Sequence, residues 1–468
     1  MKLSKSSTFQ SAVQQISGLS FIYENLPIHS SLGRKKLMES LFCTDQCEIE
    51  ETLDLTAQLI GLLKETQTKD RIGELSDYLS QFHDISHTLA NLSAQKVLDD
   101  IQFFEIKKFA ILTENVIEIL QKTDISWAEF YEMKEVVALL DPEGRRIPHF
   151  YIYAEYSDEI ARKRKQYSKE KNPDVKESLF LEISRLEDGV REKLSKQLSA
   201  FSTQLFVNFQ QISALDLVLA KAKMAIRLDL CKPKIESGRS SLRGLFHPEV
   251  SSLLQSKSRR YQPVDLSFEL SPLLITGANM SGKTILLKSV ALAQAMLQFG
   301  LYVPAAHASM MLVDEVMLSI GERESEMSGL SSFAAEILTI DDIVKTVKKN
   351  VKVVALVDEL ARTTNPEEGK LIVKSFIEIM ARYNTPAIVT THYAGIDTCV
   401  RRLRVKGLQI DDNVEITAET INDYMDYSLA EITEDEVPEE ALRIARILGV
   451  DEELTGNQKN STFAGLKK

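Results

Sequence analysis

The sequence predicts a multidomain protein in which a helical first half precedes an α/β second half. Its 468 residues exceed what one hydrophobic core organises, so two or three domains are expected. From about residue 8 to residue 140 the apolar segments are long, periodic and almost free of proline, which favours helices. After residue 270, three short apolar runs of strand type and a run with helical spacing predict an α/β fold.

Composition places the chain among globular proteins. Hydrophobic residues make up 44% and charged residues 26%, and no apolar run resembles a signal peptide or a membrane span. Four cysteines are too few for a disulfide framework, and Cys43 and Cys47 lack a second ligand pair, so we expect a cytoplasmic protein without a metal cluster. The net charge of −12 lowers the expectation of DNA as the main partner without excluding a local basic patch.

The helical half ends at a turn. Asp141-Pro142-Glu143-Gly144 carries strong turn residues and is followed by a β-type string, Pro148 to Tyr153. A mixed-charge stretch then continues to Asp174.

Residues 175–227 predict one long helix with a single apolar stripe. The stripe repeats at spacings of three and four and comprises Leu179, Ile183, Leu186, Val190, Leu194, Leu198, Phe201 and Leu205. A continuous helix would be about 80 Å long at a rise of about 1.5 Å per residue, so it would project from or span the molecule. The alternative is two ordinary helices broken near Gly189, because glycine weakens helices.

The most informative motif is a phosphate-binding loop between a strand and a helix. The strand is expected at Pro272–Thr276 and the helix at Ile285–Phe299. Between them the loop reads Gly277, Ala278, Asn279, Met280, Ser281, Gly282, Lys283 and Thr284. Such a loop turns backbone N–H groups toward phosphate oxygens, Lys283 reaches the β- and γ-phosphates, and Thr284 offers a hydroxyl to Mg²⁺. The sequence therefore predicts nucleoside triphosphate binding.

Two further strands end in residues suited to hydrolysis. The run 351–357 ends at Asp358, which we assign to Mg²⁺, and Glu359, which we assign to the attacking water. The run Pro386–Thr391 ends at His392, a residue placed to hydrogen-bond a γ-phosphate. The segment Met327–Glu336 opens another helix with serines, which fits an anion site and plain helix capping equally well.

In this order, these strings resemble the MutS family, which contains the DNA mismatch-repair ATPases. The resemblance is carried by Thr276–Thr284, the Ser-Gly-x-Ser-Ser-Phe-x-x-Glu string, Asp358-Glu359 and Thr391-His392-Tyr393. It continues outside these motifs. Ser31–Leu37 resembles the start of the MutS core, the long helix resembles its lever, and Phe246-His247-Pro248 resembles the beginning of its ATPase domain.

The resemblance implies an all-α core and lever followed by an ABC-type P-loop ATPase that works as a homodimer. Ser331 would contact the γ-phosphate bound by the opposite subunit, and Tyr261 would stack on adenine, which makes ATP with Mg²⁺ the expected cofactors. The implied domains are residues 1–140 (core and first lever arm), 141–174 (a shortened clamp-like insertion), 175–232 (lever helix) and 233–468 (ATPase with a helical tail).

The chain also departs from the family pattern. It is expected to lack the mismatch-reading domains, a full DNA-gripping clamp and a C-terminal nuclease-type domain. After Glu359 the family's Gly-Arg-Gly-Thr-Ser is replaced by a string from Ala361 to Pro366. Two partners therefore stay open: DNA, or a protein such as an adenosylcobalamin-dependent aminomutase that this ATPase would help to reactivate.

Overall fold

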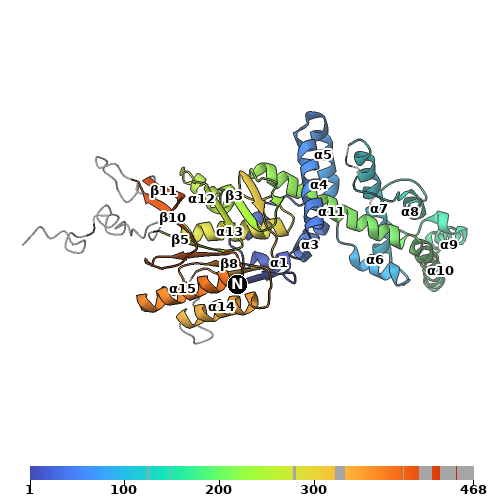
Figure 1. Cartoon of the computed structure of the whole chain (residues 1–468). Helices are drawn as coiled ribbons and strands as arrows, with labels where there is room; N and C mark the ends of the chain where they lie inside the picture. The colour runs from blue at the N-terminus through green and yellow to red at the C-terminus, as the bar shows by residue number, and fades with distance from the viewer. Residues whose placement is uncertain are drawn as a thin grey trace, which may run out of the picture. The chain divides into compact units, whose positions relative to one another are not determined.

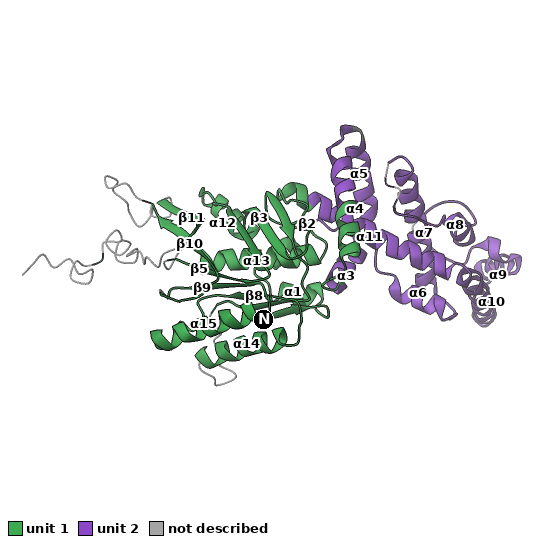
Figure 2. Ribbon diagram, in the orientation of Figure 1, with its two compact units in different colours: residues 1–25, 40–54, 224–468 green, residues 26–39, 55–223 purple. Residues whose placement is uncertain are grey.

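The computed structural model describes residues 1–123, 125, 127–147, 149–277, 281–321, 332–393, 395–409, 424–432 and 450, excluding the side chains of Gln67 and Ser332. These residues form two compact units (Figure 2). Unit 1 comprises Met1–Asn25, Ser40–Asp54 and Met224–Lys468, and unit 2 comprises Leu26–Glu39 and Leu55–Lys223. The mixed helical and α/β architecture is thus confirmed. The linear domain ranges remain predictions, and the observed units interleave along the chain instead.

Unit 1 is built on a seven-stranded sheet with the order β1-β7-β8-β9-β5-β10-β11 (Figure 1). Neighbouring strands from β7 to β10 run parallel, and only the edge strands β1 and β11 are antiparallel. The strands are β1 (Lys2–Ser4), β5 (Pro272–Thr276), β7 (Glu315–Ser319), β8 (Val353–Val357), β9 (Ala387–Thr391), β10 (Arg401–Leu408) and β11 (Met425–Glu431). The three predicted strands are therefore present as β5, β8 and β9, while β1, β7, β10 and β11 were not predicted.

Helices cover both faces of this sheet. α13 (Lys283–Gln298) lies on one face, and α14 (Ser332–Val347) and α15 (Pro366–Arg382) lie on the other (Figure 1). Val353, Ala355 and Val357 share a hydrophobic cluster with α14 and α15. Alternate residues of a strand point to opposite faces, and both faces of β8 are buried, which explains why its sequence is continuously apolar.

A smaller sheet and three short helices also belong to unit 1. The sheet has the order β2-β6-β3-β4. Its strands are β2 (Lys234–Ile235), β3 (Arg239–Leu245), β4 (Val264–Glu269) and β6 (His307–Met310), and the helices are α1 (Phe9–Val13), α2 (Leu19–Glu24) and α12 (Pro248–Ser256). The predicted helical tail falls almost entirely outside the described residues.

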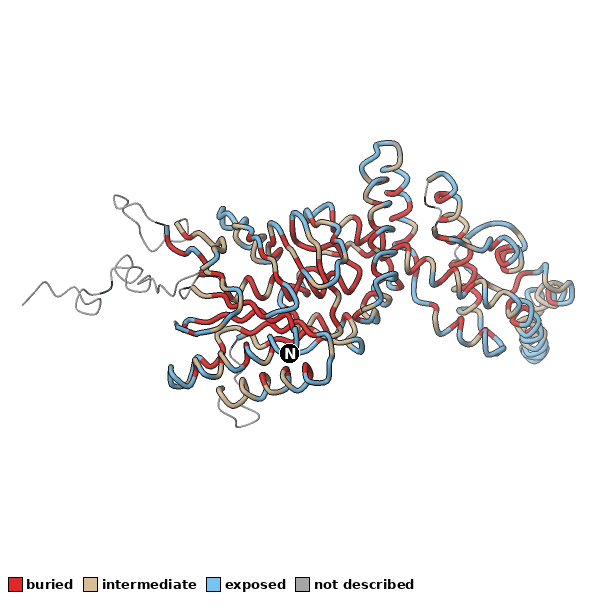
Figure 3. The backbone as a smooth tube through the Cα atoms, viewed as in Figure 1, coloured by how far each residue is buried: buried red, intermediate tan, exposed pale blue. Residues whose placement is uncertain are grey.

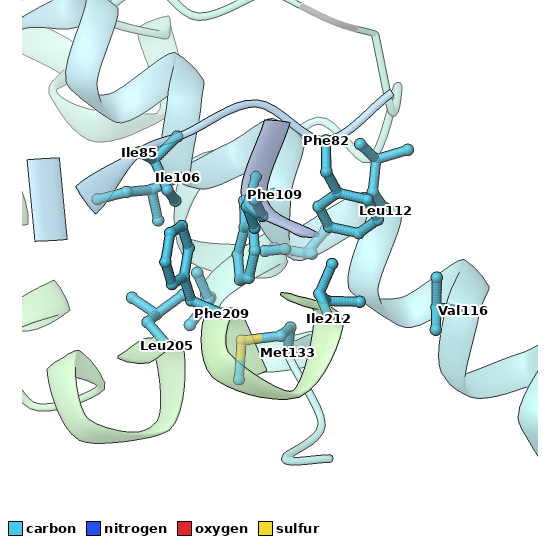
Figure 4. Close-up of a cluster of buried hydrophobic side chains, with 14 of the residues drawn as sticks. Phe82, Ile85, Ile106, Phe109, Leu112, Val116, Met133, Leu205, Phe209 and Ile212 are labelled. Carbon is cyan, nitrogen blue, oxygen red and sulfur yellow. The ribbon is translucent and has the colours of Figure 1, made fainter. Parts of the chain in front are cut away.

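Unit 2 is helical. Its elements are α3 (Ser31–Glu39), most of α4 (Gln46–Lys64), α5 (Thr66–Leu79), α6 (Ser86–Ser93), α7 (Asp100–Leu120), α8 (Lys134–Leu140), η1 (Ala154–Tyr156), α9 (Asp158–Lys169), α10 (Pro173–Ser199) and most of α11 (Ser202–Arg227). Aromatic and aliphatic side chains from α7 and α11 meet in its core (Figure 4). Phe109 contacts Phe82 and Phe209 with ring centroids 5.5 and 6.3 Å apart.

The prediction of a single long helix over residues 175–227 is wrong. The structure has two helices, α10 and α11, and the interruption lies at Ala200 and Phe201. There the N–H groups of Ala200 and Phe201 bond to the carbonyls three residues back, so the last turn tightens and the regular ladder stops. The alternative gave the right number of helices at the wrong place, because Gly189 lies inside α10, where open surroundings tolerate it.

The β-type string after residue 148 is also not a strand. Residues 149–153 are irregular, and Pro148 lies outside the described residues. Phe150 and Tyr153 are buried in the helical core of unit 2 instead. The Lys107 ammonium donates to the carbonyl of His149 and the hydroxyl of Tyr153, at 3.0 and 2.8 Å, and pairs with Asp141 at 3.0 Å. A buried cation thus satisfies a backbone carbonyl that a sheet would otherwise pair.

The buried residues concentrate in the cores of the two units. The central strands β5, β8 and β9 of unit 1 are almost entirely buried, whereas much of α10 is exposed (Figure 3). Among the described residues no helix combines the length and apolarity needed to cross a membrane.

Candidate active site

The predicted functional residues of unit 1 gather at one edge of the large sheet. β5, β8 and β9 are parallel neighbours, and Thr276 pairs with Thr391 at their ends. Gly277, Asp358 and His392 directly follow these three strands. Since parallel strands end at the same edge, the topology brings the phosphate loop and both later motifs together.

The phosphate loop leads into α13 as predicted. Gly282 has φ 81° and caps the helix, and a Cβ at this position would lie 2.9 Å from the ring of Tyr427. Glycine is therefore required here both by conformation and by close approach. Ser281 is 2% exposed, and its hydroxyl has no hydrogen-bond partner among the described residues. Ala278, Asn279 and Met280 lie outside that description.

Lys283 and Glu359 face each other across the site. Lys283 is 4% exposed, donates to the carbonyl of Gly277 at 2.8 Å, and has its Nζ 3.7 Å from Oε1 of Glu359. The second oxygen of Glu359 accepts from Arg362 at 3.2 Å. The Glu359 carboxylate is therefore held between two cations, one of which belongs to the phosphate loop.

Thr284 and Asp358 place two side chains with oxygen atoms suited to ligate a metal ion next to each other. The Thr284 hydroxyl donates to Oδ2 of Asp358 at 2.6 Å, and the Thr390 hydroxyl donates to Oδ1, also at 2.6 Å. Hard oxygen ligands of this kind fit Mg²⁺, which often uses one or two protein ligands together with phosphates and water. No cluster of three or more His, Cys, Asp or Glu side chains suited to a metal occurs among the described residues.

His392 lies close enough to Lys283, Glu359 and Arg362 for their charges to act on its pKa. Loss of water around its ring lowers the pKa of His392, with Lys283 and Arg362 acting in the same direction and Glu359 against them. The imidazole is therefore neutral at pH 7 and can both donate and accept a hydrogen bond. Ser331, the residue expected to act in trans, lies outside the described residues.

A cavity of about 310 Å³ opens beside the phosphate loop. Ser281 and Gly282 belong to its wall, and the rest is largely apolar, with Leu245, Ile285, Tyr261 and Tyr427. Burial raises the pKa of Tyr261, whose hydroxyl accepts the backbone N–H of His247 at 3.2 Å. An apolar cavity with two aromatic rings next to a phosphate site has the composition of a base-binding pocket.

Gln262 fixes the second tyrosine of this cavity. Its amide donates to Asp426 at 2.8 Å and accepts the backbone N–H of Tyr427 at 3.1 Å. Burial would raise the pKa of Asp426, but hydrogen bonds from Ser428 and Gln262 and the charge of Lys406 hold it at about 2. The carboxylate is thus ionised at neutral pH and ties strand β11 to the loop that carries Tyr261.

Sequence reasoning did not identify Thr390, Gln262 or Tyr427 as site residues. Thr390 precedes His392 in a predicted strand, so its position at the strand end offered a signal. Tyr427 lies on the edge strand β11, and no local spacing links it to Gly282, which it contacts.

Comparison with known proteins agrees with this geometry. A family model described as MutS domain V matches residues 273–461. The chain is 30% identical over 274 residues to the endonuclease MutS2 of Caldanaerobacter subterraneus subsp. tengcongensis, which covers 57% of this chain and 32% of that protein. It is 32% identical over 224 residues to the DNA mismatch repair protein MutS of Shouchella clausii, covering 47% of this chain and 26% of that protein.

A third relative is similar in the same way. The putative endonuclease MutS2 of Bacillus subtilis is 33% identical over 202 residues, covering 43% of this chain and 25% of that protein. The chain therefore spans about a third or less of the length of these relatives, between 25% and 32%. The family model falls on the segment that contains the phosphate loop, Asp358, Glu359 and His392. This segment of the chain is therefore similar to MutS domain V.

Proposed function

We propose that this chain is a Mg²⁺-dependent ATP hydrolase that works as a dimer and couples ATP turnover to DNA. The observation that carries the ATPase proposal is the meeting of Lys283, Glu359 and the Thr284–Asp358 pair at one sheet edge. Phosphoryl transfer to water needs a lysine that binds phosphate, oxygen ligands for a metal ion and a carboxylate that can activate the water.

Each residue then has a separate task. Lys283 would exchange its bonds to Gly277 and Glu359 for phosphate oxygens, and Thr284 and Asp358 would hold Mg²⁺. When bound, Mg²⁺ neutralises charge on the phosphates. Glu359 would accept a proton from the attacking water, and neutral His392 would hydrogen-bond the γ-phosphate. The dimer, with Ser331 acting in trans, rests on the family resemblance.

The cavity between Tyr261 and Tyr427 is proposed to hold adenine. Tyr427→Ala should weaken ATP binding about tenfold, because stacking of a base on an aromatic ring contributes about 1–3 kcal/mol. Titration calorimetry with ATP and Mg²⁺ measures the affinity, and Tyr383→Ala, at an exposed tyrosine of the same unit, is the matched control.

Tripolyphosphate separates base binding from phosphate binding. It has no base, so its affinity should be the same for wild type and Tyr427→Ala. An equal loss for both ligands would instead show that Tyr427 acts by shaping the loop at Gly282, which it contacts. A wild-type protein that binds neither ligand would contradict the proposed ATPase.

DNA is proposed as the macromolecular partner because the relatives include a DNA mismatch repair protein and endonucleases. The aminomutase alternative finds no support in these comparisons. Charge alone does not argue for DNA, since in the basic segment of α9 Lys163 and Arg164 are paired with Glu182 and Glu187 of α10.

Salt dependence tests this partner directly. We expect the protein to bind duplex DNA at low salt, with an affinity that falls about 10³-fold between about 50 and 200 mM salt if roughly six phosphates are contacted. Fluorescence anisotropy of a labelled duplex, with and without ATP, measures both the affinity and its slope. A complete lack of binding at low salt under both conditions would exclude DNA as the partner.

A further inference from the structure

The loop after Asp358 contains two non-glycine residues in the left-handed region. Glu359 has φ 48° and Ala361 has φ 63°. A Cβ makes this conformation unfavourable, so such residues persist only where their surroundings hold them. Ala361 is fully buried, and the turn is therefore fixed by packing and hydrogen bonds. Any group that holds Ala361 also influences where the Glu359 side chain points.

Two side chains hold the backbone of Ala361 from opposite sides. Its N–H donates to Oε1 of Glu336 on α14 at 3.1 Å, and its carbonyl accepts the Tyr393 hydroxyl at 2.7 Å. Glu336 is half-buried, and burial raises its pKa while the bond from Ala361 lowers it. Both hydrogen-bonding groups of this residue thus have a side-chain partner from elsewhere in unit 1, and the carbonyl also accepts the N–H of Thr364 at 3.3 Å.

Tyr393 is itself fixed in place by a close contact with α15. Tyr393 is 7% exposed, and its N–H donates to the Thr391 hydroxyl at 3.0 Å. A Cβ on Gly369 would lie 2.3 Å from the Tyr393 hydroxyl oxygen. The absence of a side chain at Gly369 therefore leaves the space in which that hydroxyl reaches Ala361.

We propose that Glu336 and Tyr393 are positioning residues for ATP hydrolysis, which hold the strained turn 359–361 and thereby aim the Glu359 carboxylate. The inference rests on the proposed ATPase function. It adds to that function two residues that, among the described contacts, touch neither the phosphate loop nor the Thr284–Asp358 pair. The Glu359 N–H bond to the Thr390 hydroxyl, at 2.9 Å, fixes the start of the same turn. Glu336 and Tyr393 fix its far end.

Tyr393→Phe and Glu336→Ala test the proposal. Each should lower kcat a few-fold to about tenfold, as expected for the loss of one hydrogen bond, while ATP affinity stays unchanged. Tyr383→Phe and Glu378→Ala, at exposed positions of unit 1, are the matched controls. Steady-state ATPase assays and calorimetry with ATP on the full chain give kcat and affinity separately.

A second substitution distinguishes positioning from a general loss of structure. Glycine adopts positive φ without strain, so Ala361→Gly should restore part of the lost kcat when it is added to Tyr393→Phe or Glu336→Ala. Wild-type kcat in both single variants would overturn the proposal. So would a defect that Ala361→Gly leaves unchanged. If the wild-type protein hydrolyses no ATP at all, the proposed function fails first, and the positioning role fails with it.

Discussion

Replacement of Glu359 by glutamine is expected to lower ATP turnover by about 10²- to 10⁴-fold, the usual contribution of a general base. The amide has nearly the same shape as the carboxylate but cannot accept a proton from water. ATP affinity should stay within a few-fold of wild type, since the Lys283 ammonium and the cavity beside Gly282 remain.

The expected separation of binding and turnover follows from the geometry. In the structure Glu359 accepts from Arg362 and faces Lys283, so the substitution removes a negative charge from between two cations. Bound triphosphate brings its own negative charge to Lys283, which compensates for that loss. The variant should therefore accumulate with ATP bound.

The measurements are phosphate release, ATP titration and size-exclusion chromatography. Glu359→Gln with ATP and Mg²⁺ should elute as a dimer, if ATP bridges two copies as proposed. Glu378→Gln, which changes an exposed glutamate on α15, is the matched control and should behave as wild type. Undiminished turnover in Glu359→Gln would show that another group activates the water.

The parts of the site that were predictable are encoded by short, local patterns. The spacing of the phosphate loop requires a strand before it and a helix after it, and β5 and α13 take those places. Apolar runs ending at Asp358 and His392 predicted β8 and β9, because a strand buried on both faces has a continuously apolar sequence. Adjacent parallel strands then bring the three loops together without further information.

What sequence reasoning missed depends on contacts between distant residues. Tyr427 reaches Gly282 from an edge strand. Glu336 ends a string that carries the family resemblance, but its bond to Ala361 comes from another helix, so neither contact is visible as a spacing. The interruption at Ala200 and Phe201 carries neither glycine nor proline. The resemblance located the start of α3 at Ser31, but the reason for Gly33 appears only in the packing of unit 2.

The packing around Gly33 leads to the second large expected effect, a loss of stability in unit 2. Asp216 on α11 is fully buried and accepts three hydrogen bonds, from the N–H groups of His29 and Ser30 and from the Ser30 hydroxyl, at 3.0, 2.7 and 2.5 Å. The Ser30 hydroxyl in turn accepts the N–H of Gly33 at 3.0 Å, which caps α3. A Cβ on Gly33 would lie 2.5 Å from Oδ2 of Asp216, so glycine lets the carboxylate approach.

Asp216→Ala is expected to lower the free energy of unfolding of unit 2 by about 3–5 kcal/mol. It leaves the buried N–H of Ser30 and the partly buried N–H of His29 without an acceptor, and it removes a negative charge from the N-terminus of α3. The Ser30 hydroxyl keeps its bond to Gly33 but loses the acceptor for its own proton. Asp216→Asn retains one acceptor oxygen and should therefore lose less.

Urea unfolding followed by tryptophan fluorescence measures this effect on unit 2 alone. Trp127 is the only tryptophan of the chain, and it packs against the hydrophobic core of that unit. The midpoint should fall by about 1–5 M urea in Asp216→Ala, given slopes of about 1–3 kcal/mol per molar. Asp70→Ala, at an exposed aspartate of α5, should leave the midpoint in place. Equal midpoints for both variants would mean that the capping of α3 by Asp216 does not stabilise unit 2, and Gly33 would then need another explanation.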